Sequence, residues 1–124
     1  MAQTTRPYIV SDTVVVGASA TGTAAFSTPA GEYQEVDELR FTSTSTFQIT
    51  GMNDESGVAY TDADSTDPIN NEMFPTVNSD AMATIKFIPP LRIRGNGSFS
   101  VLLLDTSAAQ NTIAMIGIGR RGME

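Results

Sequence analysis

The chain has 124 residues and a formal net charge of -7, from fourteen acidic against seven basic side chains. This length predicts one domain, and the negative charge argues against nucleic-acid binding, which requires clustered lysine and arginine. The sequence contains no cysteine and no histidine, which excludes disulfides, thiolate nucleophiles, Cys/His zinc sites and imidazole catalysis.

Short runs of β-branched and aromatic residues, separated by Gly, Pro, Asn, Asp and Ser, predict an all-β chain. In chain order, the expected strands are Tyr8–Val16, Gly22–Ser27, Gln34–Phe41, Thr46–Thr50, Met82–Ile88, Leu91–Arg94, Ser98–Leu104 and Thr112–Gly119, with further pairing near Val58–Tyr60. Antiparallel strands with such turns predict one β-sandwich domain over residues 1–124, of jelly-roll or related Greek-key topology.

Two segments are expected outside the sandwich. Residues 1–8 are polar and predict an N-terminal arm that becomes ordered on a neighbouring molecule. Residues 51–79 predict a long acidic loop, because the stretch from Gly51 to Asp80 holds seven acids and no base. Loops of this length within a compact domain are commonly functional or disordered.

Alternation along the strands predicts which side chains face the core. The expected inward residues are Leu39, Phe41, Phe47, Ile49, Ile85, Phe87, Leu91 and Ile93. The run "VLLLD" (101–105) is apolar on both faces, so this strand is expected at the centre of a sheet or against a partner.

Two turn signals lie close together in the last third of the chain. The "GNGS" stretch (95–98) predicts a tight hairpin that joins Leu91–Arg94 to Ser98–Leu104, because Asn-Gly accepts a positive φ. The preceding Pro89–Pro90 pair lacks two backbone donors and predicts a bend or a sheet edge.

Asp105 follows that apolar strand in the stretch "DTSA", which is similar to the Asp-Thr/Ser-Gly turn of aspartic proteases. Those enzymes need two carboxylates a few ångströms apart. In the small proteases of this class a flap lies between the Asp turn and a later apolar strand. Here only a few residues separate Asp105 from the similar strand "IAMIGIGRR" (113–121), which leaves no room for a flap. We therefore expect Asp105 to end its strand in an Asx-turn, in which the carboxylate accepts a nearby backbone N–H.

Asp62, Asp64 and Asp67 alternate as the first ligands of a calcium loop do. An EF-hand would need Gly at position 67 and Glu at position 73, where the chain has Asp67 and Met73. A solvated acidic loop is the favoured interpretation, and an irregular calcium site stays open.

Basic residues gather in the last third of the chain. Arg92 and Arg94 share one strand face, and Arg120 and Arg121 end the last expected strand. Paired arginines on one face can bind carboxylates in bidentate fashion, so these four residues are predicted to meet acidic groups of this chain or of a partner. No apolar run approaches the ~20 residues of a membrane span, and the first twelve residues show no signal-peptide pattern.

The chain resembles the small decoration, or cement, proteins on the heads of tailed bacteriophages. The resemblance lies in the polar arm "MAQTTRPYIV", the Ser/Thr/Ala-rich all-β body without Cys and His, and the ending "SFSVLLLDTSAAQNTIAMIGIGRRG". It implies a virion structural protein on the outer capsid surface, a homotrimer that clamps neighbouring major-capsid subunits. The expected partner contacts are Arg6, Pro7, Tyr8, Arg92, Arg94, Arg120 and Arg121.

This interpretation includes no enzymatic activity, no cofactor, no metal, no nucleic acid and no membrane. Two alternatives stay open from the sequence. One is another virion component, such as a tail, fibre or capsid protein. The other is a β-sandwich module that binds calcium or a glycan, although carbohydrate modules stack sugars on exposed aromatic rings and this chain has no Trp and three Tyr.

Overall fold

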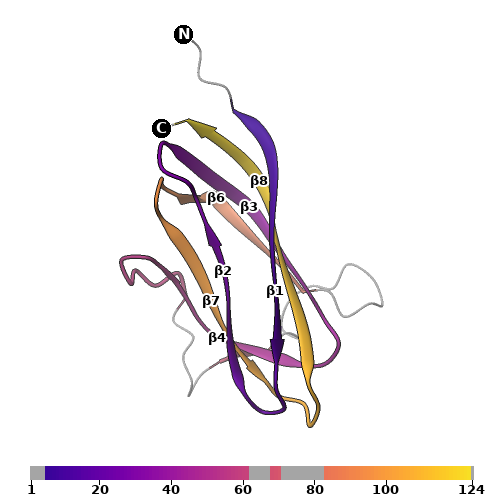
Figure 1. Cartoon of the computed structure of the whole chain (residues 1–124). Helices are drawn as coiled ribbons and strands as arrows, with labels where there is room; N and C mark the ends of the chain where they lie inside the picture. Colours follow the sequence, from indigo (N-terminus) through magenta and orange to yellow (C-terminus); the bar gives the residue numbers. More distant parts are fainter. Residues whose placement is uncertain (1–4, 62–67, 71–82, 124) are drawn as a thin grey trace.

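The computed structural model describes residues 5–61, 68–70 and 83–123 (Figure 1). Within these ranges the chain forms strands and no helix, in the order β1 (Arg6–Val16), β2 (Thr21–Ser27), β3 (Glu32–Ser43), β4 (Phe47–Asp54), β5 (Ile69–Asn70), β6 (Ala83–Ile93), β7 (Ser98–Asp105) and β8 (Asn111–Met123). The expected all-β domain is confirmed.

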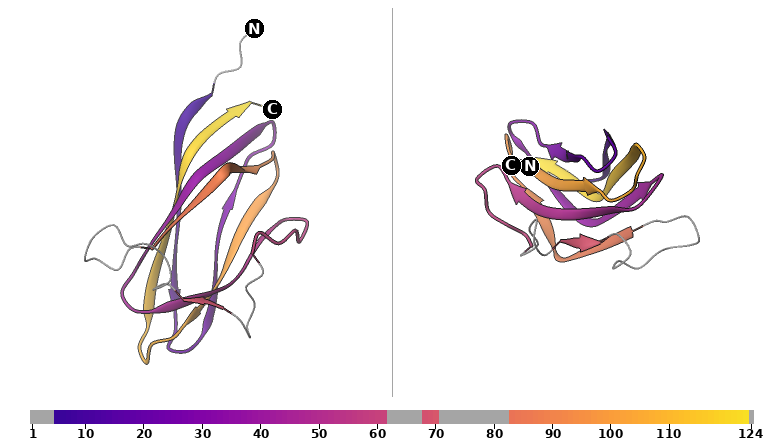
Figure 2. Two further views of the ribbon diagram at one scale, coloured as in Figure 1. Left: turned by 180° about the vertical axis from the view of Figure 1, so that it is seen from behind. Right: turned by 90° about the horizontal axis from the view of Figure 1, so that it is seen from below.

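The strands form two four-stranded antiparallel sheets that pack face to face (Figure 2). Sheet A has the order β1-β8-β3-β6 and sheet B the order β2-β7-β4-β5. Every connection between consecutive strands crosses between the sheets except the one from β4 to β5. This interleaved order is the jelly roll, which decides between the two topologies that the sequence left open.

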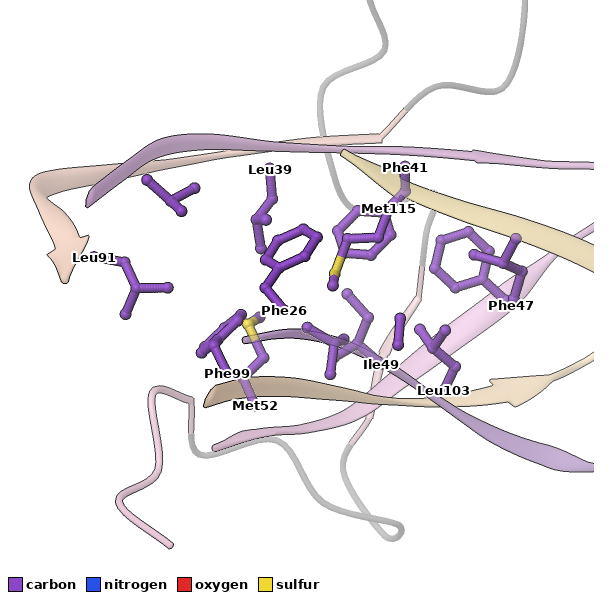
Figure 3. Close-up of a cluster of buried hydrophobic side chains, with 14 of the residues drawn as sticks. Phe26, Leu39, Phe41, Phe47, Ile49, Met52, Leu91, Phe99, Leu103 and Met115 are labelled. Atoms are coloured by element: carbon purple, nitrogen blue, oxygen red, sulfur yellow. The ribbon is translucent and has the colours of Figure 1, made fainter. Parts of the chain in front are cut away.

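The core lies between the sheets and follows the alternation of apolar residues (Figure 3). In β7, Phe99, Val101 and Leu103 are fully buried, whereas Leu102 on the opposite face is 38% exposed. Because β7 pairs with β2 on one side and β4 on the other, its expected central position is confirmed. Aromatic rings fix the packing of the core, with the centroids of Phe41 and Phe47 5.8 Å apart.

The expected hairpin at Gly95–Ser98 is wrong. The turn itself forms, with Asn96 at φ 58° and the N–H of Gly97 2.9 Å from the carbonyl oxygen of Arg94. However, β6 pairs with β3 in sheet A, whereas β7 enters sheet B. An Asn-Gly pair specifies a local reversal of the chain but not the sheet that the next strand joins, and β7 pairs with β2 and β4.

The two strands expected on either side of Pro89–Pro90 are one continuous strand, β6. It lies at the edge of sheet A, as the missing N–H groups predicted. Its pairing with β3 is interrupted at the proline pair, because Val36 pairs with Leu91 and Glu38 with Lys86, so that the register skips residues 87–90.

The boundaries of the two outlying segments differ from expectation. β1 already begins at Arg6, so the last three residues of the expected arm pair with β8. Residues 51–54, expected in the acidic loop, complete β4, and β5 adds a short strand at Ile69–Asn70. Asn53 forms a bridge to Ala59, which confirms the further pairing near Val58–Tyr60. The candidate calcium ligands Asp62, Asp64 and Asp67 lie outside the described residues.

Candidate interaction surface

The register of sheet A brings most of the predicted contact residues together at one end of the sheet. One row across the four strands consists of Pro7, Arg120, Glu35 and Arg92. The next row places Arg6 beside Arg121 and Gln34. Strands far apart in the sequence thus gather six of the seven candidates, and Arg94 lies just beyond the end of β6.

Arg120 is the centre of a charge network on the outer face of sheet A. Its guanidinium donates to Glu35 at 3.1 Å and to both carboxylate oxygens of Asp37 at 2.8 and 3.0 Å. The hydrogen bond to Glu35, followed by the hydrogen bond and charge of Asp37, raises the pKa of Arg120 above its ordinary value. Glu35 and Asp37 lie two positions apart in β3 and therefore face the same side of the sheet, which lets both carboxylates reach Arg120.

Arg92 and Arg94 are exposed on one side of β6, as alternation predicted. The Arg92 guanidinium lies 4.0 Å from the centroid of the Tyr33 ring, a cation–π contact. The Arg94 guanidinium lies 3.7 Å from the carboxylate of Glu55, in the loop after β4. Exposed pairs of this kind contribute little to stability, so both side chains are accessible for contacts with another molecule.

The end of the sandwich near the termini is closed by Arg6, Tyr8 and Arg121. Arg6 pairs with Glu32 at 3.4 Å. Arg121 is only 7% exposed, lies 3.9 Å from the centroid of the Tyr8 ring and donates to the Gln34 side chain at 2.9 Å. Arg121 therefore packs inside the end of the sandwich, while its neighbour Arg120 points outward, because adjacent strand residues face opposite sides.

An apolar stripe on the same face, which the sequence pattern did not reveal, is formed by Ile9 of β1 and Ile116 and Ile118 of β8. Val15 is a separate exposed apolar residue of this face, because it lies opposite Thr112. Ile9 is 66% exposed and Val15 is 61% exposed, whereas Ile116 and Ile118 are half-buried. Ile9 lies directly opposite Ile118 in the register. The signal was present as apolar residues on both faces of β1 and β8, but only the register shows that Ile9 and Ile118 are adjacent.

Asp105 forms the Asx-turn that the sequence predicted, and its role is structural. Its carboxylate accepts the Ser107 N–H at 3.1 Å, the Ser19 N–H at 3.0 Å and the Asn111 side-chain amide at 3.2 Å. Burial acts to raise the pKa of Asp105, but the hydrogen bonds from Ser107, Ser19 and Asn111 prevail and hold it below its ordinary value. The carboxylate thus ties the β1–β2 turn to the β7–β8 turn.

No metal-binding cluster of three or more acidic side chains occurs in the described residues. In the same residues, no helix has the length and apolar character needed to cross a membrane.

Comparisons with known proteins assign no family. No protein-family profile and no curated protein matches the chain. One similar solved structure is the enzymatically active domain of tailspike protein 4 from bacteriophage CBA120, with 12% sequence identity and a TM-score of 0.34. The match covers 94% of this chain but only 19% of the tailspike chain. A likeness at this level assigns neither function nor ancestry.

Proposed function

We propose that the protein is a structural component of a tailed-phage virion. In this proposal it decorates the outer surface of the head and stabilises it by clamping neighbouring major-capsid subunits. It acts without catalysis, cofactor or metal, as a homo-oligomer and most simply as a trimer. The proposal starts from the resemblance of the sequence to decoration proteins.

The observation that carries the proposal is the outer face of sheet A. It combines the apolar stripe on β1 and β8 with the Glu35–Asp37–Arg120 network and Arg92 on the neighbouring strands. Protein interfaces share this composition, an apolar centre beside a polar rim enriched in arginine. A jelly roll suits such a role because its sheets form a rigid platform, and viral capsid domains use it.

The fold alone does not distinguish a virion protein from a glycan-binding module, because lectin domains are also jelly rolls. The described part of the chain offers one conspicuously exposed tyrosine for sugar stacking, Tyr60 at 41% exposure. That ring also packs edge-on against Phe99 at 5.7 Å and its hydroxyl donates to Asp54. No second exposed aromatic ring occurs among the described residues to extend a sugar-stacking surface beyond Tyr60, so we favour the virion role.

The experiment is a binding assay with expanded, undecorated heads of the phage that encodes the chain. Purified protein is mixed with the heads, the heads are sedimented, and the bound copies per head are counted. The proposal predicts saturable binding at a ratio set by the symmetry of the head, and heads that withstand higher temperature. Absence of binding at micromolar concentration, together with binding in a glycan array, would replace the virion role with the glycan-binding one.

One of the predicted contact residues, Arg92, is tested in the same assay. Arg92→Glu reverses an exposed charge of the predicted set without removing a buried partner, and is expected to weaken head binding. Thr23→Glu on the outer face of sheet B adds a negative charge to an exposed position of the opposite sheet and serves as the control. Equal weakening by both variants would mean that net charge, and not this surface, governs binding.

A further inference from the structure

The turn between β6 and β7 contains the pair Asn96–Gly97, and Asn96 alone among the asparagines of the sequence is followed by glycine. Asparagine before glycine is chemically labile, because the backbone nitrogen of the next residue can attack the side-chain amide carbon. Glycine has no Cβ to obstruct this attack. Asn96 is exposed, and its side-chain amide has no hydrogen-bond partner among the described residues. The nucleophile, the amide and solvent therefore meet at this turn.

The fold requires both residues of the pair. Asn96 has φ 58°, a left-handed conformation that asparagine tolerates better than most residues. At position 97, an added Cβ would lie 2.8 Å from the carbonyl oxygen of Arg94 and would collide with the Glu55 carboxylate. The turn therefore depends on a sequence that is prone to modification.

Backbone hydrogen bonds around the pair oppose the reaction in the folded protein. The Gly97 N–H, which belongs to the attacking nitrogen, donates to the Arg94 carbonyl oxygen at 2.9 Å. The Asn96 N–H donates to the Thr28 carbonyl oxygen at 2.9 Å, and the Thr28 N–H donates to the Gly97 carbonyl oxygen at 3.1 Å. Ring closure requires rotation about the bond between the Asn96 Cα and its carbonyl carbon. This rotation pulls the Gly97 nitrogen away from Arg94, so the turn must open before the reaction.

The Glu55 carboxylate holds the residues that flank the pair. One of its oxygens accepts the Ser98 N–H at 3.1 Å, and the same oxygen lies 3.7 Å from the Arg94 guanidinium. Glu55 follows β4 whereas Ser98 begins β7, so this contact joins separate segments of the chain. The carboxylate therefore restrains the turn from outside it.

We propose that Asn96 is a site of spontaneous deamidation, whose rate is set by these backbone hydrogen bonds and by the Glu55 contact. The Gly97 nitrogen bonds to the Asn96 side-chain carbon, the carbon–nitrogen bond of the amide breaks, and ammonia leaves with the proton of the Gly97 nitrogen. Water then opens the succinimide ring at either carbonyl, which yields aspartate or isoaspartate. Isoaspartate lengthens the main chain by a methylene group and disrupts the turn. This inference is independent of the proposed function.

The test incubates the purified protein in mildly alkaline buffer, folded and in urea, and follows position 96 by tandem mass spectrometry. We expect conversion to aspartate and isoaspartate in urea, and conversion slower by roughly tenfold or more in the folded protein, because the turn must first open. Asn111, whose amide is buried and hydrogen-bonded, is the internal control of the folded sample and stays unmodified. Absence of conversion at position 96 in urea overturns the proposal, as does conversion that is equally fast in both samples.

Two variants test the restraint by Glu55. Glu55→Ala frees the Ser98 N–H and is expected to speed conversion in the folded protein by about fivefold, the factor that one hydrogen bond contributes. Ser56→Ala, at the neighbouring exposed position, is the matched control and leaves the rate unchanged. Urea midpoints confirm that both variants are folded. If Glu55→Ala converts no faster than Ser56→Ala, the assignment of this restraint to the carboxylate is refuted.

Asn96→Gly keeps the left-handed conformation of the turn and has no amide to react. After equal incubation, we expect the urea midpoint of the wild type to fall as its isoaspartate content rises, whereas the midpoint of Asn96→Gly stays constant. A wild type that carries isoaspartate and keeps its midpoint would refute the disruption of the turn.

Discussion

Asn111 offers the most direct test of how the loops at one end of the sandwich are held. Its side chain is fully buried at the start of β8. The amide nitrogen donates to the carbonyl oxygens of Ser45 and Thr46 at 3.1 and 3.0 Å and to Asp105 at 3.2 Å. The amide oxygen accepts the Ser45 N–H at 3.2 Å. One side chain thus joins the β3–β4 turn to the Asp105 carboxylate.

The substitution Asn111→Ala removes this connection and keeps the strand. Each buried polar group left without a partner costs about 1–3 kcal/mol, and water entering the space left by the amide satisfies some of them. We therefore expect the free energy of unfolding to fall by about 2–4 kcal/mol. The control is Thr112→Ala, at the neighbouring exposed position, for which we expect a change within about 0.5 kcal/mol.

Urea unfolding followed by circular dichroism measures both variants, with the slope m compared to confirm that the unfolding transition stays the same. A loss below about 1 kcal/mol for Asn111→Ala would refute the reasoning, because that is no more than one ordinary hydrogen bond contributes. The same conclusion follows if the control loses as much as the test variant.

Three further predictions concern other parts of the structure. Asp105→Asn should be less stable than wild type at pH 7, and the difference should shrink in acid. The folded-state pKa of Asp105 is lowered, so its contribution is present above the unfolded carboxyl pKa of about 3.9 and is lost as pH falls through the folded value. Urea midpoints measured from pH 7 downward test this, and a difference that stays constant with pH would contradict it. Arg120→Met should lower the free energy of unfolding by about 0.5–1 kcal/mol. This loss should shrink in 1 M salt, because the ion pairs of Arg120 are partly exposed. A loss that is independent of salt would mean that packing of the Arg120 side chain dominates. Gly119→Ala should destabilise by about 2 kcal/mol or more, since an added Cβ would collide with the Glu35 carbonyl oxygen, and thermal unfolding that matches wild type would refute that close approach.

The sequence predicted the parts of the fold that depend on local alternation. Leu39, Phe41, Phe47 and Ile49 are fully buried as expected, because a strand with one wet face must place every second residue inside. The Asx-turn at Asp105 was also predictable, since it involves residues two positions apart.

Features that depend on contacts between distant strands were not predictable in the same way. The Asn-Gly turn at Asn96 indicates a reversal, but the sheet that β7 enters is decided by pairing with β2 and β4. The inward direction of Arg121 depends on the phase of β8, which the apolar residues on both faces of that strand conceal.

The candidate surface likewise combines features that residue type indicates with features that depend on pairing between distant strands. The arginines were identified by residue type, but their gathering in one region depends on sheet A joining β1, β8, β3 and β6. The exposure of Ile9 and Val15 went unrecognised because an exposed apolar residue looks, in sequence, like any core residue of a strand.

The central claim is that the protein acts by assembly on a virion, and electron microscopy of heads with bound protein tests it most directly. We expect density for the protein on the outer surface of the head, with each copy bridging neighbouring capsid subunits. Density located on the tail would contradict decoration of the head, and heads that carry no density after incubation with saturating protein would contradict the virion role itself.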